Sequence, residues 1–132
     1  MRKRHKPDFF RTESAAAKVK RANAIVAEVA QKYDVPLLKT ATVLGEATTD
    51  AASLFRNPAN SGNEDGVHPT PIGYFRLADV IAKRIRAEKW SPKRILCIGD
   101  SITFGVNVKG EGTASPDAET YPGRLAKELK GK

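Results

Sequence analysis

Three residues whose side chains together can perform acyl transfer lie in two short stretches of the chain. Ser101 directly follows the apolar run at 95–98, where a chain leaving a buried strand would present the hydroxyl at the end of a sheet. A serine hydroxyl is a weak nucleophile and needs a base, for which the imidazole of His68 is the candidate. Asp65 lies three residues before His68, so one tight turn would let its carboxylate hold the second ring nitrogen. Either stretch alone is also compatible with a polar turn that has no catalytic role.

The hydrophobic periodicity predicts three helices around these residues. Apolar residues recur at helical spacing over 15–33 and over 71–89, and a last helix begins near Tyr121. Thr70 is suited to cap the second of these helices, and Pro71 fits its first position, where a backbone N–H would be unpaired in any case. The Asp65–His68 turn therefore leads directly into a helix.

Two short apolar runs, at 35–38 and at 94–98, predict strands. The run at 94–98 is continuous rather than alternating, which is typical of a parallel strand covered on both faces. Helices alternating with strands predict an α/β fold. Two strands are usually too few for an independently stable sheet, so any interpretation of the chain has to explain this shortage.

Composition excludes several classes of protein. The chain has 132 residues, which allows one ordinary domain. Its apolar stretches are too short to cross a membrane, and no apolar segment follows the basic start at 2–6 as a signal peptide would require. The single cysteine, Cys97, excludes an intrachain disulfide and a multi-cysteine zinc site. We therefore expect a soluble protein with no membrane insertion, whose compartment the composition leaves open.

The net charge of +8 raises the question of nucleic-acid binding. Basic residues gather at 2–6 and recur in the later predicted helices, where they lie between apolar positions as on a solvated face. No aromatic platform and no nucleic-acid motif accompanies them. We interpret them as a basic surface, with nucleic-acid binding as the alternative.

The two stretches with candidate chemistry also carry a family resemblance. Residues 95–105, ILCIGDSITFG, resemble the first block of the SGNH hydrolases, also called the GDSL esterase/lipase family. Residues 65–74, DGVHPTPIGY, resemble the last block of the same family. With the flanking helices, the resemblance covers most of the chain, from about residue 9 to residue 129.

The resemblance implies a site, a reaction and a fold. Ser101 would be the nucleophile, with its backbone N–H as one oxyanion donor; His68 would be the general base and then acid, and Asp65 would orient His68. The implied reaction is hydrolysis of a small-molecule ester through an acyl-enzyme, without a metal or an organic cofactor. The implied parent fold is a three-layer, flavodoxin-like α/β fold with a five-stranded parallel sheet, of which this chain holds the counterparts of strands 5 and 1 only.

The chain departs from the family pattern in two ways. The Asp-His block precedes the serine block, and the family's two middle blocks are absent, including the Gly-x-Asn-Asp whose asparagine is an oxyanion donor. The Asn residues of this chain lie in other contexts, so none inherits that role; the nearest candidates are Asn60, Asn63 and Asn107.

Three explanations of the order remain open. The first is a tandem fragment, in which 1–89 ends one hydrolase domain, 90–93 is a linker and 94–132 begins the next domain. The others are a circular permutant without its middle, and a minimal rearranged domain that completes itself within the chain or across an oligomer. In the tandem case Ser101 belongs to a different site from His68. In a single chain we expect the three side chains to meet only if the two strands pair directly.

The sequence therefore predicts a serine ester hydrolase of SGNH type that acts on small acyl esters, with carbohydrate acetyl esters as the narrower expectation. The alternative is a non-catalytic fragment, or a basic α/β binding module, that lacks a complete oxyanion hole. The expected partners are a small-molecule ester and either the remainder of a larger hydrolase or a second copy of the chain.

Overall fold

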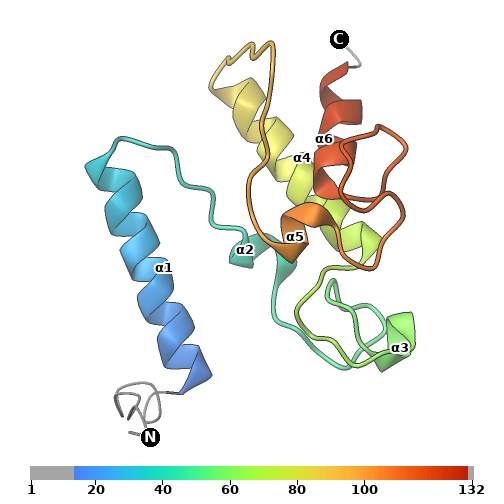
Figure 1. Cartoon of the computed structure of the whole chain (residues 1–132). Coiled ribbons are helices and arrows are strands. Elements are labelled where there is room, and N and C mark those ends of the chain that lie inside the picture. The colour runs from blue at the N-terminus through green and yellow to red at the C-terminus, as the bar shows by residue number, and fades with distance from the viewer. Residues whose placement is uncertain (1–13, 131–132) are drawn as a thin grey trace, which may run out of the picture. The chain divides into compact units, whose positions relative to one another are not determined.

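The computed structural model describes residues 14–130, which contain six helices (Figure 1). They are α1 (Ala15–Lys32), α2 (Ala41–Leu44), α3 (Pro58–Ser61), α4 (Pro71–Ala87), α5 (Ser101–Phe104) and α6 (Tyr121–Lys130). The chain divides into two compact units, residues 1–38 and residues 39–132. The basic cluster at 2–6 lies outside the described residues. The second unit contains the whole of both stretches with candidate chemistry, on either side of the predicted linker at 90–93.

The first unit consists, as far as it is described, of α1 and the residues that follow it. The side chain of Ser14 caps the helix by accepting a hydrogen bond from the backbone N–H of Ala17 over 3.2 Å. The helix ends before Asp34, whose φ of 52° is in the left-handed region. The helix predicted over 15–33 is therefore confirmed to within one residue. No residue of α1 is buried, and even Val19 of its apolar face is 60% exposed.

The predicted α/β fold is wrong. Helices make up 49% of the structure, and residues 14–130 contain no strand, only an isolated antiparallel bridge between Phe55 and Pro69. Both predicted strands, 35–38 and 94–98, have no regular secondary structure. A strand needs a neighbouring chain to pair with its backbone N–H and C=O groups, and an apolar run does not itself supply that neighbour. The counterparts of strands 5 and 1 therefore form no flavodoxin-like sheet here.

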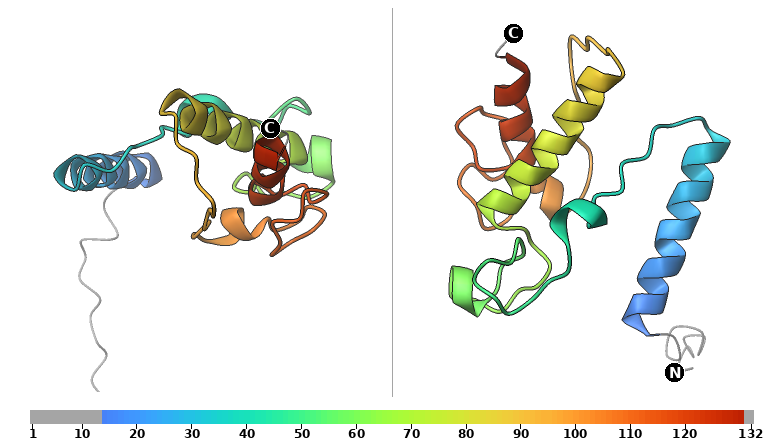
Figure 2. Two further views of the ribbon diagram at one scale, coloured as in Figure 1. Left: turned by 90° about the horizontal axis from the view of Figure 1, so that it is seen from above. Right: turned by 180° about the vertical axis from the view of Figure 1, so that it is seen from behind.

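The core of the second unit lies between α4 and α6, which run side by side (Figures 1 and 2). Leu125 of α6 is 3% exposed and packs against buried residues of α4, namely Ala78, Ala82 and Ile85. Full burial of a leucine side chain contributes about 1.5–3 kcal/mol to the stability of a fold. The last helix was predicted to begin near Tyr121, and it does.

The start of α4 follows the sequence prediction closely. Thr70 is the N-cap, and its hydroxyl oxygen accepts a hydrogen bond from the backbone N–H of Gly73 over 3.2 Å. Pro71 occupies the first helical position. Among residues 14–130, no helix is both long enough and apolar enough to span a membrane.

Candidate active site

The Asp65–His68 turn is held by the carboxylate of its own first residue. Asp65 Oδ1 accepts hydrogen bonds from the backbone N–H groups of Val67 and His68, each over 2.9 Å. Aspartate commonly closes a turn in this way because its short side chain reaches the backbone two or three residues ahead. The two backbone hydrogen bonds therefore orient the Asp65 carboxylate independently of its contact with the imidazole.

A second segment, residues 54–56, pairs with the same turn through backbone hydrogen bonds. The N–H of Arg56 donates to the carbonyl of His68 over 2.9 Å, and the carbonyl of Arg56 accepts from Gly66 over 2.9 Å. The carbonyl of Leu54 accepts from the N–H of Thr70 over 2.8 Å. These three bonds hold the turn against residues 54–56.

Ser101 is the first residue of α5, a helix of a single turn with a cap at each end. The side chain of Asp100 accepts a hydrogen bond from the N–H of Ile102 over 3.0 Å. Gly105 ends the helix with a φ of 79°, a conformation that favours glycine, and a Cβ at this position would strike the γ-methyl group of Thr120. The two caps set the ends of this one-turn helix and therefore the position of Ser101 at its start.

The helix α5 is anchored to the core by the two residues after Ser101. Ile102 packs against the cluster of buried residues that includes Tyr74 and Leu77 of α4. The hydroxyl of Thr103 lies 3.1 Å from the phenol oxygen of Tyr121 on α6. The position of Ser101 thus depends on α4 and α6 together.

The structure brings Asp65, His68 and Ser101 into one hydrogen-bonded chain. His68 Nε2 lies 3.0 Å from Ser101 Oγ, and His68 Nδ1 lies 2.9 Å from Asp65 Oδ2 and 3.1 Å from Oδ1. A carboxylate only accepts, so in the neutral imidazole Nδ1 carries the proton and Nε2 presents its lone pair to the serine hydroxyl. The side chains of His68 and Asp65 are 20% and 12% exposed, so the pair is largely shielded from solvent.

The expectation that these residues meet only through direct pairing of the two predicted strands is wrong. Neither segment forms a strand, and the contact arises instead from two other features. One is the backbone pairing of 54–56 with the Asp65–His68 turn, and the other is the anchoring of α5 on α4 and α6.

The pKa of Asp65 is lowered from its ordinary value by its hydrogen bonds. Burial is the largest single influence and acts in the opposite direction, because it disfavours the charged carboxylate. The backbone N–H groups of His68 and Val67, followed by the imidazole of His68, outweigh it. Asp65 is therefore ionised at neutral pH and available to orient the imidazole.

One donor to an oxyanion can be assigned among the described residues. The backbone N–H of Ser101 donates to no described acceptor and is available for a substrate oxygen. The side-chain amide of Asn60 is already used, because it donates to the carbonyls of Ser53 and Phe55. The amide of Asn63 donates to the carbonyl of Ser61 over 3.5 Å. The site therefore has one assigned oxyanion donor.

Sequence reasoning missed Arg56. Its Nη1 donates a hydrogen bond to the carbonyl of Asn107 over 3.0 Å and so joins the Asp65–His68 side of the site to the loop that follows Ser101. No local pattern marks this residue, because its partner is 51 positions away. Among residues 14–130, no group of three or more His, Cys, Asp or Glu residues is placed to hold a metal ion.

Comparison with known proteins adds no relative. The chain matches no protein-family model, no curated protein sequence and no solved structure at a significant level.

Proposed function

We propose that this chain is a serine ester hydrolase that acts through an acyl-enzyme on Ser101. The observation that carries the proposal is the hydrogen-bonded chain from Asp65 through His68 to Ser101, with 2.9 Å and 3.0 Å at its two links. These distances lie within the range at which a base can remove a proton from a nucleophile. The resemblance of 95–105 and 65–74 to the SGNH hydrolases supports the same reaction class.

The proposed reaction begins with attack of Ser101 Oγ on the carbonyl carbon of an ester. The hydroxyl proton passes to His68 Nε2 as the new C–O bond forms, and Asp65 stabilises the imidazolium. The backbone N–H of Ser101 donates a hydrogen bond to the oxyanion of the tetrahedral intermediate. The imidazolium then returns the proton to the departing alcohol, which leaves an acyl group on Ser101.

Deacylation uses the same groups in the same order. His68 Nε2 takes a proton from water, the hydroxide oxygen attacks the acyl carbon, and the tetrahedral intermediate collapses with return of the proton to Ser101 Oγ. The products are a carboxylic acid and the regenerated enzyme. Small acyl esters, including carbohydrate acetyl esters, are the proposed substrates.

A non-catalytic role is the second candidate, and the assignment of a single oxyanion donor favours it. Loss of one donor typically lowers kcat by about 10²–10³-fold. A chain with an activated serine and one donor would react with a strong electrophile but turn over ordinary esters slowly. The experiment must therefore measure nucleophile reactivity and ester turnover separately.

The test is labelling of the folded full chain with a fluorophosphonate, followed by intact mass and peptide mapping. The proposal expects one adduct per chain, located on Ser101. Ser101→Ala should abolish the adduct, and Ser115→Ala, at an exposed serine outside the site, should leave it unchanged. Hydrolysis of p-nitrophenyl acetate by the same preparations should show the same dependence on Ser101.

The two candidates give different results. An adduct on Ser101 with turnover that Ser101→Ala removes supports the hydrolase. An adduct without turnover supports the non-catalytic role with an activated serine. A chain that circular dichroism shows to be folded, and that gives no adduct, contradicts the hydrolase proposal.

A further inference from the structure

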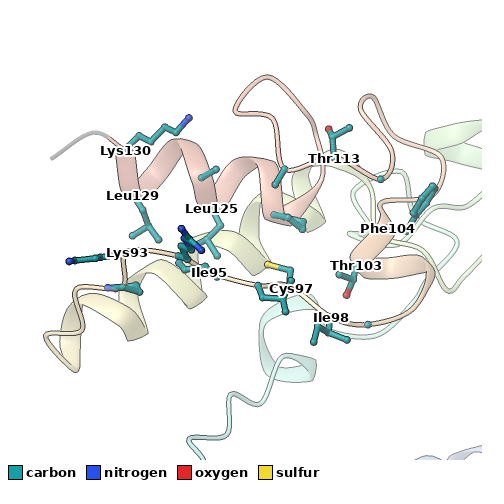
Figure 3. Close-up of a pocket in the computed structure, with 18 of the residues that line it drawn as sticks. Lys93, Ile95, Cys97, Ile98, Thr103, Phe104, Thr113, Leu125, Leu129 and Lys130 are labelled. Carbon is teal, nitrogen blue, oxygen red and sulfur yellow. The ribbon is translucent and has the colours of Figure 1, made fainter.

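A cavity of about 790 Å³ in the second unit does not belong to the Asp65–His68–Ser101 site. Figure 3 shows it between the segment from Lys93 to Ile98 and helix α6, which contributes Leu125 and Leu129. Ser101 and His68 are not among its lining residues. Its walls are largely apolar, since they also include Ile95 and the ring of Phe104.

The cavity follows the whole length of this segment. Nine consecutive residues, Pro92 through Asp100, all line it. In an extended chain, successive side chains point to opposite sides of the backbone. A cavity that contacted side chains on one side only would therefore be lined by every second residue. The unbroken run of lining residues therefore indicates that the cavity also meets the backbone of the segment.

The main-chain groups of residues 91–99 have no partner within residues 14–130. Residues 91–99 take part in no backbone hydrogen bond between described residues, and no described side chain bonds to their N–H or C=O groups. Leu96 and Ile98 are each 82% exposed as well. An unpaired, apolar main-chain edge of this kind is the template to which an extended peptide adds as a strand.

The basic residues that line the cavity indicate which kind of peptide would bind there. Lys93, Arg94 and Lys130 line the cavity, and among the described residues none of them forms an ion pair with a carboxylate. A second copy of the chain carries the same net charge of +8, so approach of two copies is opposed by like charge. A segment with acidic residues at one end and apolar residues after them complements this cavity.

We propose that the Pro92–Asp100 edge binds an extended peptide of another protein by strand addition, with the acidic end of the peptide at Lys93, Arg94 and Lys130. Backbone hydrogen bonds to residues 94–98 align the peptide, and its apolar side chains fill the cavity against α6. The proposal does not depend on catalysis by Ser101.

The probe is a capped, fluorescein-labelled peptide, Glu-Asp-Val-Thr-Val-Thr-Val-Thr-Gly, used with its sequence-reversed form because the strand direction is open. We expect saturable binding of one of the two to the full chain by fluorescence anisotropy. A control peptide with Lys-Lys in place of Glu-Asp should bind at least tenfold more weakly. In the double variant Lys93→Glu with Lys130→Glu, the two peptides should bind equally. A twin with N-methyl groups on alternate amides should lose binding at least tenfold, because it cannot donate to the edge.

Two proline variants test which main-chain edge is used. The N–H groups of consecutive residues in a drawn-out chain point to opposite edges, so only one of Ile95→Pro and Leu96→Pro removes a donor that faces the cavity. Neither N–H has a described partner, so neither variant breaks an internal hydrogen bond. We expect one variant to weaken binding at least tenfold and the other less than threefold, with both chains folded by circular dichroism.

Three results would overturn the proposal. The first is no binding of either peptide to the folded chain. The second is binding that the N-methylated twin retains, which would exclude strand addition even if a proline variant failed to fold. The third is a concentration-dependent dimer of the chain alone, found by light scattering and abolished by one proline variant, which would identify a second copy as the occupant of the edge.

Discussion

The guanidinium of Arg56 donates a hydrogen bond from Nη1 to the carbonyl oxygen of Asn107 over 3.0 Å, and it does so from the segment that also pairs with the Asp65–His68 turn. Asn107 lies in the loop after α5 and has a φ of 68°, and its own N–H donates to the carboxylate of Glu111 over 2.8 Å. One side chain thus connects the acid–base half of the site to the nucleophile half. The two halves are otherwise joined by the contact between His68 and Ser101 and by core packing.

Replacement of Arg56 with methionine should lower the reactivity of Ser101 without unfolding the chain. Methionine keeps the apolar part of the side chain but removes the hydrogen-bond donor to Asn107. The loop after Ser101 then loses its link, through residue 56, to the Asp65–His68 turn. A displacement of about 1 Å between reacting groups can cost about 10²-fold in rate, and we expect a fall of about 10- to 100-fold in the rate of fluorophosphonate labelling. Arg76→Met, at an exposed arginine of α4, is the matched control and should label at the unaltered rate. Equal rates for both variants would show that the tether does not position the nucleophile.

Asp65→Asn should separate orientation of the imidazole from closure of the turn. The amide oxygen can still accept from the N–H groups of Val67 and His68, so the turn should survive. The amide group no longer fixes the proton on His68 Nδ1, so Nε2 loses its role as acceptor for the serine hydroxyl. A loss of about 10⁴-fold in labelling rate is expected, by analogy with serine enzymes in which the orienting carboxylate is replaced. Thermal unfolding of the variant and the unaltered chain, measured together, should show that the fold remains; labelling at the original rate would exclude Asp65 from the mechanism.

The start of α4 and most of its buried face could be predicted from the sequence because their causes are local, whereas the one-turn helices α2, α3 and α5 were not predicted. The hydroxyl of Thr70 and the ring of Pro71 act within one turn of α4, and the spacing of Leu77, Ala78 and Ile85 defines its buried face. The same is true of the inside of the Asp65–His68 turn, where the bonds that Asp65 accepts from Val67 and His68 span at most three residues.

The other errors concern partners that lie far away in the sequence. Residues 95–98 have the composition of a buried strand, but the described chain offers no second strand, so Leu96 and Ile98 stay 82% exposed. The meeting of His68 with Ser101 depends on packing of α5 against α4 and α6, which no local pattern encodes. The bond from Arg56 to Asn107 was missed for the same reason.

Tyr74 should make the chain less stable as the pH rises from 10 to 12. Burial, with a further contribution from the nearby Asp65 charge, raises the pKa of this phenol to about 12, and its side chain is 0% exposed. In this interval the unfolded chain loses the proton while the folded chain keeps it, so the free energy of unfolding falls with pH, by about 2 kcal/mol over two units. Tyr74→Phe should abolish this part of the dependence. At pH 7 the variant should be as stable as the unaltered chain or up to about 1 kcal/mol more stable, because the buried hydroxyl of Tyr74 has no described partner.

The measurement for Tyr74 is urea unfolding at pH 7, 10 and 11.5, compared with Tyr33→Phe. Tyr33 is 65% exposed and forms none of the buried contacts of Tyr74, so this control should follow the unaltered chain at every pH. Identical pH dependence for Tyr74→Phe and Tyr33→Phe would contradict the assignment.

Gly99→Ala should displace the nucleophile, because the space beside Gly99 is already occupied. A Cβ at this position would collide with the hydroxyl oxygen of Thr103, which lies one helical turn ahead in α5 and hydrogen-bonds with Tyr121. Relief of the collision turns the Thr103 hydroxyl away from Tyr121, or moves the segment before Ser101 or the helix α5 that begins with it, and we expect labelling of Ser101 to fall at least tenfold.

Thr103→Ala removes the obstructing oxygen, so Gly99→Ala combined with Thr103→Ala should label faster than Gly99→Ala alone. Neighbouring sites that share a contact are expected to show this departure from additivity. Thr103→Ala by itself reports the cost of losing the bond to Tyr121, about 0.5–1.5 kcal/mol of stability. If the effect of the double variant on the labelling rate equals the product of the two single effects, the alanine at position 99 does not act on Ser101 through Thr103.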